Sequence, residues 1–252
     1  MEVLRPVGAT VAFAVAAYIV IAAFALALGA LVTNVVVGGA LGRADHDVAR
    51  WFADRRSSFW DDLSLVGSYF AETVTVLVIL AVVLALFARR RRWPSFGLLV
   101  VSLTLEATVY LAATYFVSRN RPAVPRLEHL VVSDSFPSGH TAAGVALYGC
   151  FAIIVWGETR RRIWRILTLF LAVVAPVIVA TSRVYRGMHN PTDVLCGALI
   201  GLGCIAGGYF AVRVGVAVAQ ARREGAEDGR GVVSSPALEP IDHEALRAGV
   251  AR

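Results

Sequence analysis

Two short polar stretches, each directly before a long apolar run, concentrate side chains that can do chemistry. The residues are Ser138, Gly139 and His140 in the first stretch, Arg183, His189 and Asp193 in the second, and Arg119 and Arg121 upstream of both. Guanidinium groups bind phosphate oxygens in pairs, and histidine exchanges protons near neutral pH. These residue types together favour chemistry on a phosphate group.

The first of these stretches has the features of an anion-binding site. Ser138 directly precedes an expected helix start, so its hydroxyl, Gly139 and the free N–H groups of the first turn can surround an anion. Arg121 and Arg183 are expected to bind the oxygens of the same phosphate. A purely structural alternative is that Ser138 only caps the helix.

The histidines provide the reactive groups. We expect His140 and His189 to face each other across the phosphate, one attacking phosphorus and the other protonating the leaving oxygen, without a metal or another cofactor. Asp193 follows His189 by four residues and is expected to accept the second N–H of that ring. The same segment also fits a plain helix start, with Asn190 as the N-cap, Pro191 next and Asp193 at the third position.

The rest of the chain is that of a membrane protein. Hydrophobic residues make up 58% of the 252 positions and charged residues 17%, whereas a soluble domain has about a quarter charged. A spanning helix needs about 20 apolar residues. Six segments qualify, and the first is too long for a secretory signal. They lie within Pro6–Gly42, Val66–Ala88, Phe96–Val117, Thr141–Gly157, Ile166–Thr181 and Val194–Val212. The sequence predicts an all-α bundle of six transmembrane helices.

Two segments lie outside the expected spans. Within 41–69, apolar residues such as Trp51 and Phe52 recur at helical spacing among charged ones, which indicates an interfacial amphipathic helix between spans one and two. A helix packed as a cap on the bundle is the alternative. From Gln220 the apolar runs end, so we expect a membrane domain over 1–219 and a disordered cytoplasmic tail over 220–252.

The cationic residues are all arginine, 24 in number, and the chain has no lysine. They cluster at the ends of apolar runs, which favours contact with membrane lipids over nucleic acid. More arginines fall on the side that holds Arg89–Arg92 and Arg160–Arg162. Both termini are therefore expected in the cytoplasm, with the polar stretches facing outward. The three cysteines lie in apolar runs and indicate neither a disulfide nor a zinc site.

The polar stretches resemble the signature of the type 2 phosphatidic acid phosphatase (PAP2) superfamily. That signature reads Lys-x6-Arg-Pro, then Pro-Ser-Gly-His, then Ser-Arg-x5-His-x3-Asp. The second part is complete at Pro137–His140 and the third at Ser182–Asp193, and the resemblance covers about Ala40 to Gly215. It implies a membrane phosphatase acting on undecaprenyl diphosphate, phosphatidate, phosphatidylglycerophosphate or a similar lipid. A lipid-binding or transport protein without catalysis is the alternative.

The resemblance also assigns roles. It implies that His189 becomes phosphorylated, that Asp193 orients it and that His140 is the general acid. Arg121, Arg183, Ser138 and Gly139 would bind the phosphate. The first part of the signature departs from the family, because its lysine position falls on Thr114. Arg119 is the expected replacement among the substrate-binding residues, with Arg126 and Arg186 as weaker candidates.

One acidic residue, Glu106, lies in the middle of an expected span. An acid at this depth is unfavourable and marks a functional candidate. A structural pairing inside the bundle, with an arginine or with a hydroxyl such as that of Tyr110, is the alternative.

Overall fold

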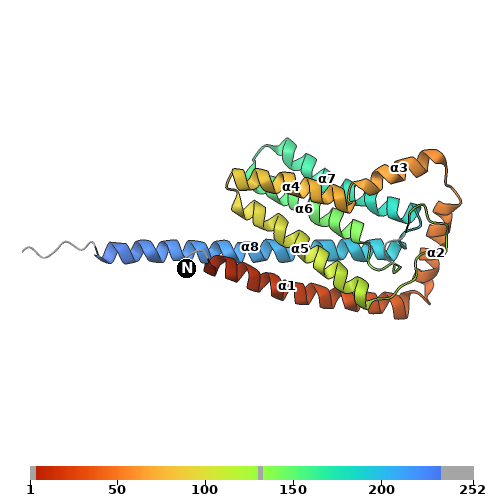
Figure 1. Ribbon diagram of the computed structural model, residues 1–252, viewed down its shortest axis with the longest axis horizontal. Helices are drawn as coiled ribbons and strands as arrows, with labels where there is room; N and C mark the ends of the chain where they lie inside the picture. The colour runs from red at the N-terminus through yellow and green to blue at the C-terminus, as the bar shows by residue number, and fades with distance from the viewer. Residues whose placement is uncertain (1–3, 130–132, 234–252) are drawn as a thin grey trace, which may run out of the picture.

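The computed structural model describes residues 4–129 and 133–233, and every regular element in this part of the chain is helical (Figure 1). The α-helices are α1 (Leu4–Leu31), α2 (Ala40–Ala53), α3 (Ser58–Tyr69), α4 (Thr73–Arg89), α5 (Trp93–Phe116), α6 (Gly139–Glu158), α7 (Arg162–Tyr185) and α8 (Pro191–Val233). A short π-helix, η1 (Val32–Val36), continues α1. The expected all-α architecture is confirmed.

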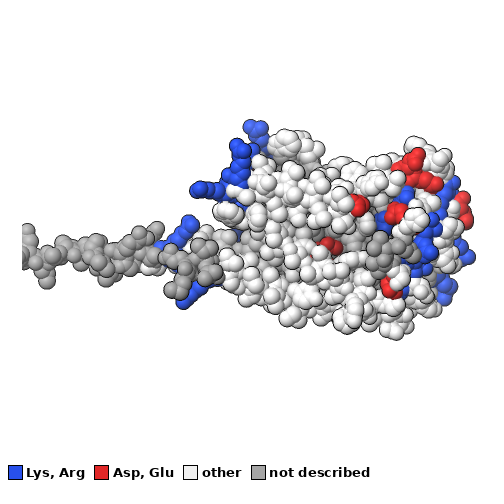
Figure 2. All heavy atoms as spheres, viewed as in Figure 1, with Lys and Arg blue, Asp and Glu red and all other residues white. Residues whose placement is uncertain are grey.

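Six helical stretches of the described chain are long and apolar enough to cross a membrane. They correspond to the six expected spans, but the second is built from α3 and α4 with a break between them. At this break the Glu72 carboxylate accepts hydrogen bonds from the backbone N–H groups of Val74, at 2.8 Å, and Thr75, so it caps α4. Figure 2 shows a mostly uncharged surface between two charged ends, as a membrane-spanning bundle requires.

The amphipathic segment 41–69 folds as two helices, α2 and α3, and α2 lies across one end of the bundle (Figure 1). Asp45 and Ala49 on one face of α2 are buried, while the Trp51 side chain is exposed. The expected helix is therefore present in α2, and it packs as a cap against α7 and α8.

The helix α8 is the central element, because it packs along α1, α5 and α6. Gly197 permits its closest approach to the loop before α6. A Cβ atom at this position would lie 2.5 Å from the carbonyl oxygen of Ser138. The helix also extends to Val233, so residues 220–233 are helical where the sequence indicates disorder. Residues 234–252 of the expected tail lie outside the described residues.

Candidate active site

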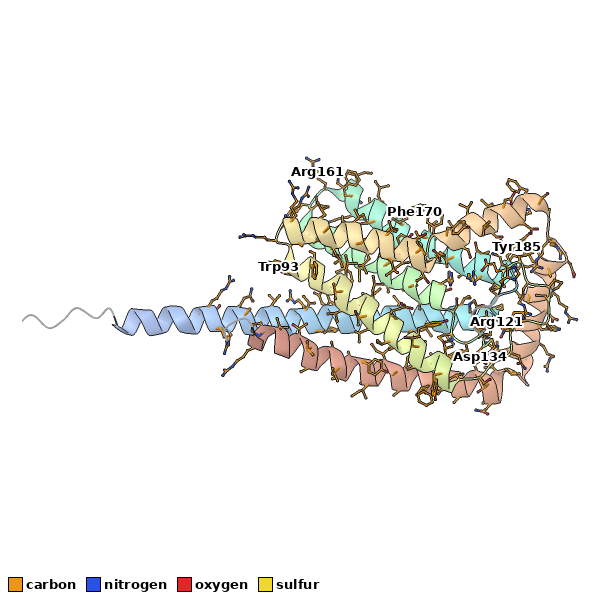
Figure 3. All side chains as sticks on the ribbon, viewed as in Figure 1. Trp93, Arg121, Asp134, Arg161, Phe170 and Tyr185 are labelled. Atoms are coloured by element: carbon orange, nitrogen blue, oxygen red, sulfur yellow. The ribbon has the colours of Figure 1, made fainter. Side chains whose placement is uncertain are left out.

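The two polar stretches meet at the end of the bundle that α2 covers. Figure 3 places Arg121, Asp134 and Tyr185 at this end, and Trp93 and Arg161 at the other. The second stretch is a tight turn after α7, in which the N–H groups of Met188 and His189 donate to the carbonyl oxygen of Arg183. Gly187 has a φ of 72° within this turn, a conformation that favours glycine. The turn points His189 back toward the bundle.

His189 is buried and held by one well-defined hydrogen bond. Its Nδ1 atom lies 2.7 Å from the backbone carbonyl oxygen of Ser135. A carbonyl oxygen only accepts hydrogen bonds, so Nδ1 carries the proton and Nε2 keeps a free lone pair. Burial lowers the pKa of His189 well below its ordinary value of 6.5, and the charges of Arg183, Arg121 and His140 lower it further. The ring is therefore neutral at pH 7, with the Nε2 lone pair available.

Asp193 has a different contact from the one expected. It does not accept from the His189 ring, because Ser135 takes that role and the Asp193 oxygens already have partners. One oxygen accepts from the backbone N–H of Asn190 at 2.8 Å and from the Ser135 hydroxyl. The other accepts from Arg119. Asp193 thus accepts a hydrogen bond at the start of α8 and holds Ser135, whose carbonyl oxygen fixes the His189 ring.

Arg119 also has partners other than those expected of a phosphate ligand. It is buried, and its guanidinium forms an ion pair with Asp45 at 2.7 Å and a second with Asp193. It also donates to the Thr192 hydroxyl at 2.8 Å. Two buried carboxylates, one on α2 and one in the first turn of α8, require a cation, and Arg119 is that cation. These contacts favour a role in supporting His189, through Asp193, over the expected role of Arg119 as a replacement for the family lysine.

The two other arginines of the expected site lie around the histidines. Arg121 donates from Nε to the carbonyl oxygen of Ser133 at 3.2 Å and from Nη1 to that of Met188, directly before His189. Burial lowers the pKa of Arg121, and the nearby charge of Arg183 lowers it further. Arg183 is buried, donates from Nη1 to the Ser68 hydroxyl at 2.9 Å, and keeps a buried Nε without a hydrogen-bond partner. An unpaired donor of this kind suits a phosphate oxygen.

The loop before α6 holds the remaining expected residues. Ser138 occupies the N-cap position, and its hydroxyl is 2.9 Å from the Thr141 hydroxyl, while its N–H donates to the Asp193 carbonyl oxygen at 3.1 Å. Gly139 packs closely on the Tyr110 ring, since a Cβ atom there would lie 2.8 Å from that ring. His140 follows in the first turn of α6 and is close enough to act on His189 electrostatically. The structure therefore brings both stretches together.

Glu128 is an important residue that the sequence argument does not identify. Its carboxylate lies between two arginines, 2.7 Å from Nη1 of Arg183 and in contact with Nε of Arg186. Burial alone would raise the pKa of Glu128, but these two cations outweigh burial and lower it. A carboxylate here contacts the same guanidinium that is expected to bind phosphate. The sequence signal that could have identified Glu128 is its position between Arg126 and His129, in the loop that joins the two motifs.

Comparison with known proteins indicates the family of the chain. The family model of the PAP2 superfamily matches residues 95–215. Escherichia coli (strain K12) YbjG, whose name describes an undecaprenyl-diphosphatase, is 31% identical over 140 residues, which cover 53% of this chain and 66% of that protein. Mouse sphingosine-1-phosphate phosphatase 2 is 38% identical over 80 residues, covering 31% of this chain and 22% of that protein. The chain thus spans less than two thirds of the length of either relative.

Two solved structures share the fold. The transmembrane PAP2-type phosphatidylglycerolphosphate phosphatase of Bacillus subtilis superposes with a TM-score of 0.64 at 24% identity, covering 78% of this chain and 94% of the other. Aquifex aeolicus LpxE gives a TM-score of 0.51 at 23% identity, covering 66% and 93%. With the six apolar helices, these likenesses show a multi-pass membrane protein. The chain belongs to the PAP2 superfamily.

Proposed function

We propose that the protein is a membrane phosphatase that cleaves a lipid phosphate or diphosphate through a phosphohistidine at His189. The observation that carries this proposal is the state of the His189 ring. The hydrogen bond from Nδ1 to Ser135 leaves Nε2 unprotonated, and burial and neighbouring cations keep the ring neutral. Arg183 and Arg121 both lie close enough to act on this ring electrostatically and are the candidate phosphate ligands.

The first step is the transfer of the phosphoryl group to the enzyme. The Nε2 lone pair of His189 attacks phosphorus, the bond from phosphorus to the lipid oxygen breaks, and His140 gives its proton to that leaving oxygen. Arg121, Arg183 and the N–H groups of the first turn of α6, beginning at Gly139, stabilise the charge on the remaining phosphoryl oxygens. The Ser135 carbonyl, held by Asp193 through the Ser135 hydroxyl, stabilises the His189 ring as it becomes cationic.

The second step is hydrolysis of the phosphohistidine. His140, now neutral, accepts a proton from a water molecule as that water attacks phosphorus. The bond between phosphorus and Nε2 of His189 breaks, phosphate leaves, and both histidines return to their starting states. The protein groups supply the nucleophile, the acid and the cations, so this scheme requires no added metal.

The substrate is an amphiphilic phosphate whose head reaches the α2 end of the bundle. We place this end on the outer face of the membrane, from the arginine distribution. Undecaprenyl diphosphate, phosphatidate and phosphatidylglycerophosphate are the candidate substrates, and the names of YbjG and the Bacillus subtilis structure support this group.

A phosphate-release assay tests the proposal. Purified protein is given each candidate lipid in EDTA, beside a His189→Ala variant. We expect release by the wild-type protein alone, and a radiolabelled phosphate that stays on the protein after an acid-free quench. Equal release by His189→Ala, or release that depends on added divalent metal, would overturn the mechanism.

A further inference from the structure

An apolar groove leads from the membrane-facing surface to the candidate active site. It has a volume of about 620 Å³ and lies between α4, α5 and α6, with Val76, Leu80, Leu103 and Leu111 among its apolar residues. Gly139 and His140 line the same groove. An apolar chain placed here would therefore end beside the general acid.

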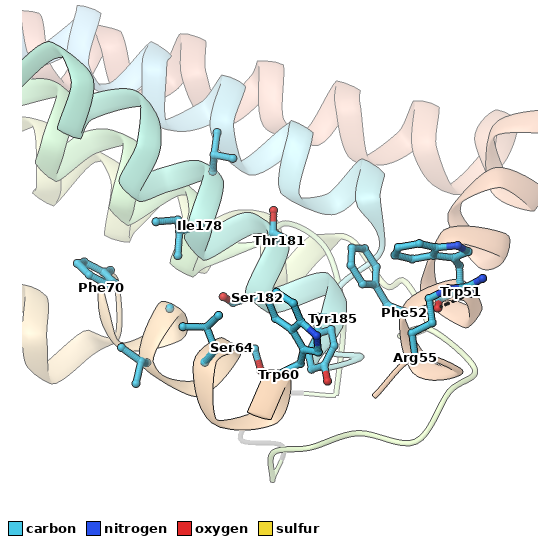
Figure 4. Close-up of a pocket in the computed structure, with 14 residues that line it drawn as sticks. Trp51, Phe52, Arg55, Trp60, Ser64, Phe70, Ile178, Thr181, Ser182 and Tyr185 are labelled. Atoms are coloured by element: carbon cyan, nitrogen blue, oxygen red, sulfur yellow. Dashed lines mark hydrogen bonds between the residues drawn. The ribbon is translucent and has the colours of Figure 1, made fainter. Parts of the chain in front are cut away.

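A second cavity of about 580 Å³ lies between α2, α3 and α7, where Figure 4 shows Trp51, Trp60, Ile178 and Tyr185 around it. None of the residues assigned to phosphate binding or catalysis lines this cavity. Of these two cavities, the groove between α4, α5 and α6 is therefore the one suited to the apolar chain of the substrate.

The groove contains one acidic side chain, that of Glu106. Only 6% of Glu106 is exposed, it lines the groove, and within the described residues no hydrogen bond or ion pair joins its carboxyl group to another residue. The surrounding residues are mostly apolar. A carboxyl group in such a place is unfavourable unless a ligand supplies a hydrogen-bonding or cationic partner.

The depth of Glu106 indicates what that partner is. Tyr110 lies one turn further along α5, and its ring packs on Gly139, beside the site of chemistry. Four helical residues span about 6 Å, so Glu106 lies about 6 Å deeper in the bundle than Tyr110. In a bound lipid phosphate, the atoms at that depth are those that join the phosphate to the apolar chain.

We propose that Glu106 hydrogen-bonds the polar linkage between phosphate and chain, and so selects lipid phosphates that have such a linkage. A glycerol ester and a sphingoid amino alcohol both offer hydrogen-bonding groups there. A polyprenyl monophosphate offers only hydrocarbon at that depth, whereas a polyprenyl diphosphate places its second phosphate there. The inference rests on the proposed function and narrows its substrate class to lipids with a polar linkage.

The test compares dioleoyl phosphatidate, sphingosine phosphate and a polyprenyl phosphate as substrates of wild type, Glu106→Leu and Glu106→Gln. For Glu106→Leu, the ratio of kcat/KM on phosphatidate to that on polyprenyl phosphate is expected to fall about tenfold, the size of one lost hydrogen bond. Glu106→Gln restores the ratio for a neutral ester partner, because an amide still donates, but not for a cationic amine. The two linkages are thereby distinguished.

Ser102→Ala is the matched control. Ser102 lies one turn before Glu106 on α5, is buried and faces Gly208 of α8 rather than the groove. It should leave the substrate ratio unchanged. An equal loss on all three lipids in Glu106→Leu, or a lowered Tm with an unchanged ratio, would show a structural role and overturn the inference.

A binding measurement separates this inference from the proposed function. The same three lipids are titrated into His189→Ala and into the double variant with Glu106→Leu, with Kd as the readout. The inference is supported if the double variant binds phosphatidate or sphingosine phosphate more weakly but binds the polyprenyl phosphate equally well, even if no lipid is hydrolysed. Equal Kd values for the two proteins would overturn it even if the phosphatase reaction is established.

Discussion

His189 combines a fixed tautomer with a lowered pKa, and in the proposed mechanism this combination determines how activity depends on pH. Because the folded pKa lies well below 6.5, the ring stays neutral as the pH falls through 6.5. The acid limb of kcat/KM, which reports the free enzyme, is therefore expected below pH 6.5. An unfolded chain would take up a proton at His189 in that range, so folding stability falls from pH 6.5 down to the folded pKa.

The variant Arg121→Gln checks this electrostatic cause. Removing one of the cations that lower the pKa of His189 is expected to move the acid limb toward higher pH, besides any loss of phosphate binding. A pH series of kcat/KM measures the limb. A limb that lies above pH 6.5 in the wild type would contradict the assignment of a neutral, buried nucleophile.

Glu128 contacts the guanidinium of Arg183, which we propose binds the phosphate. Because its carboxylate pairs with Nη1 of Arg183 and repels an anion bound at the unpaired Nε, Glu128→Gln is expected to bind phosphate about threefold more tightly. Competitive inhibition by inorganic phosphate measures this effect. Asp134→Asn is the control, since Asp134 accepts from Ser118 on the same loop instead. Weaker inhibition of Glu128→Gln than of the wild type would show that Glu128 assembles the site.

At the scale of elements, Asp45 attaches the capping helix α2 to the start of α8. Its carboxylate accepts from the Thr192 N–H at 3.0 Å and pairs with Arg119, which also holds Asp193. Arg119→Ala would leave two buried carboxylates without their cation and is expected to lose about 3–5 kcal/mol of stability. Thermal unfolding in detergent measures this loss, with the exposed Arg126→Ala as the control.

The kinetics of Arg119→Ala separate support from phosphate binding. A residue that positions His189 through Asp193 and Ser135 should lower kcat and leave inhibition by inorganic phosphate nearly unchanged. A large loss of phosphate inhibition with unchanged Tm would instead return Arg119 to the phosphate-binding group.

These contacts also show which features of the site could not be predicted from the sequence. Hydropathy predicts the spans because each must be apolar over a fixed length. The motif residues identify the site because they adjoin helix starts. The ion pair between Arg119 and Asp45 depends instead on how α2 packs across α8. The residue types alone do not specify this packing. Asp193 has both of the roles considered, at the helix start and in support of His189. One of its carboxylate oxygens accepts from the Asn190 N–H and from the Ser135 hydroxyl together.

At the scale of the whole molecule, the two charged ends are unlike. Arginines gather where α4 meets α5 and where α6 meets α7, while the α2 end carries mixed charges, many of them paired (Figure 2). Arginine-rich short loops remain in the cytoplasm. The α2 end, and with it the active site, is therefore expected outside, with both termini inside.

Labelling of an introduced cysteine tests this orientation. The native Cys150, Cys196 and Cys204 are all buried, so we expect little background labelling from them. Ala123→Cys lies exposed in the loop between α5 and α6, and Gly157→Cys lies at the opposite end, where a side chain would meet nothing within 4 Å. In intact cells, a membrane-impermeant maleimide should label Ala123→Cys, and label Gly157→Cys only after permeabilisation. The reverse pattern would place the phosphatase site in the cytoplasm and require a substrate from the inner leaflet.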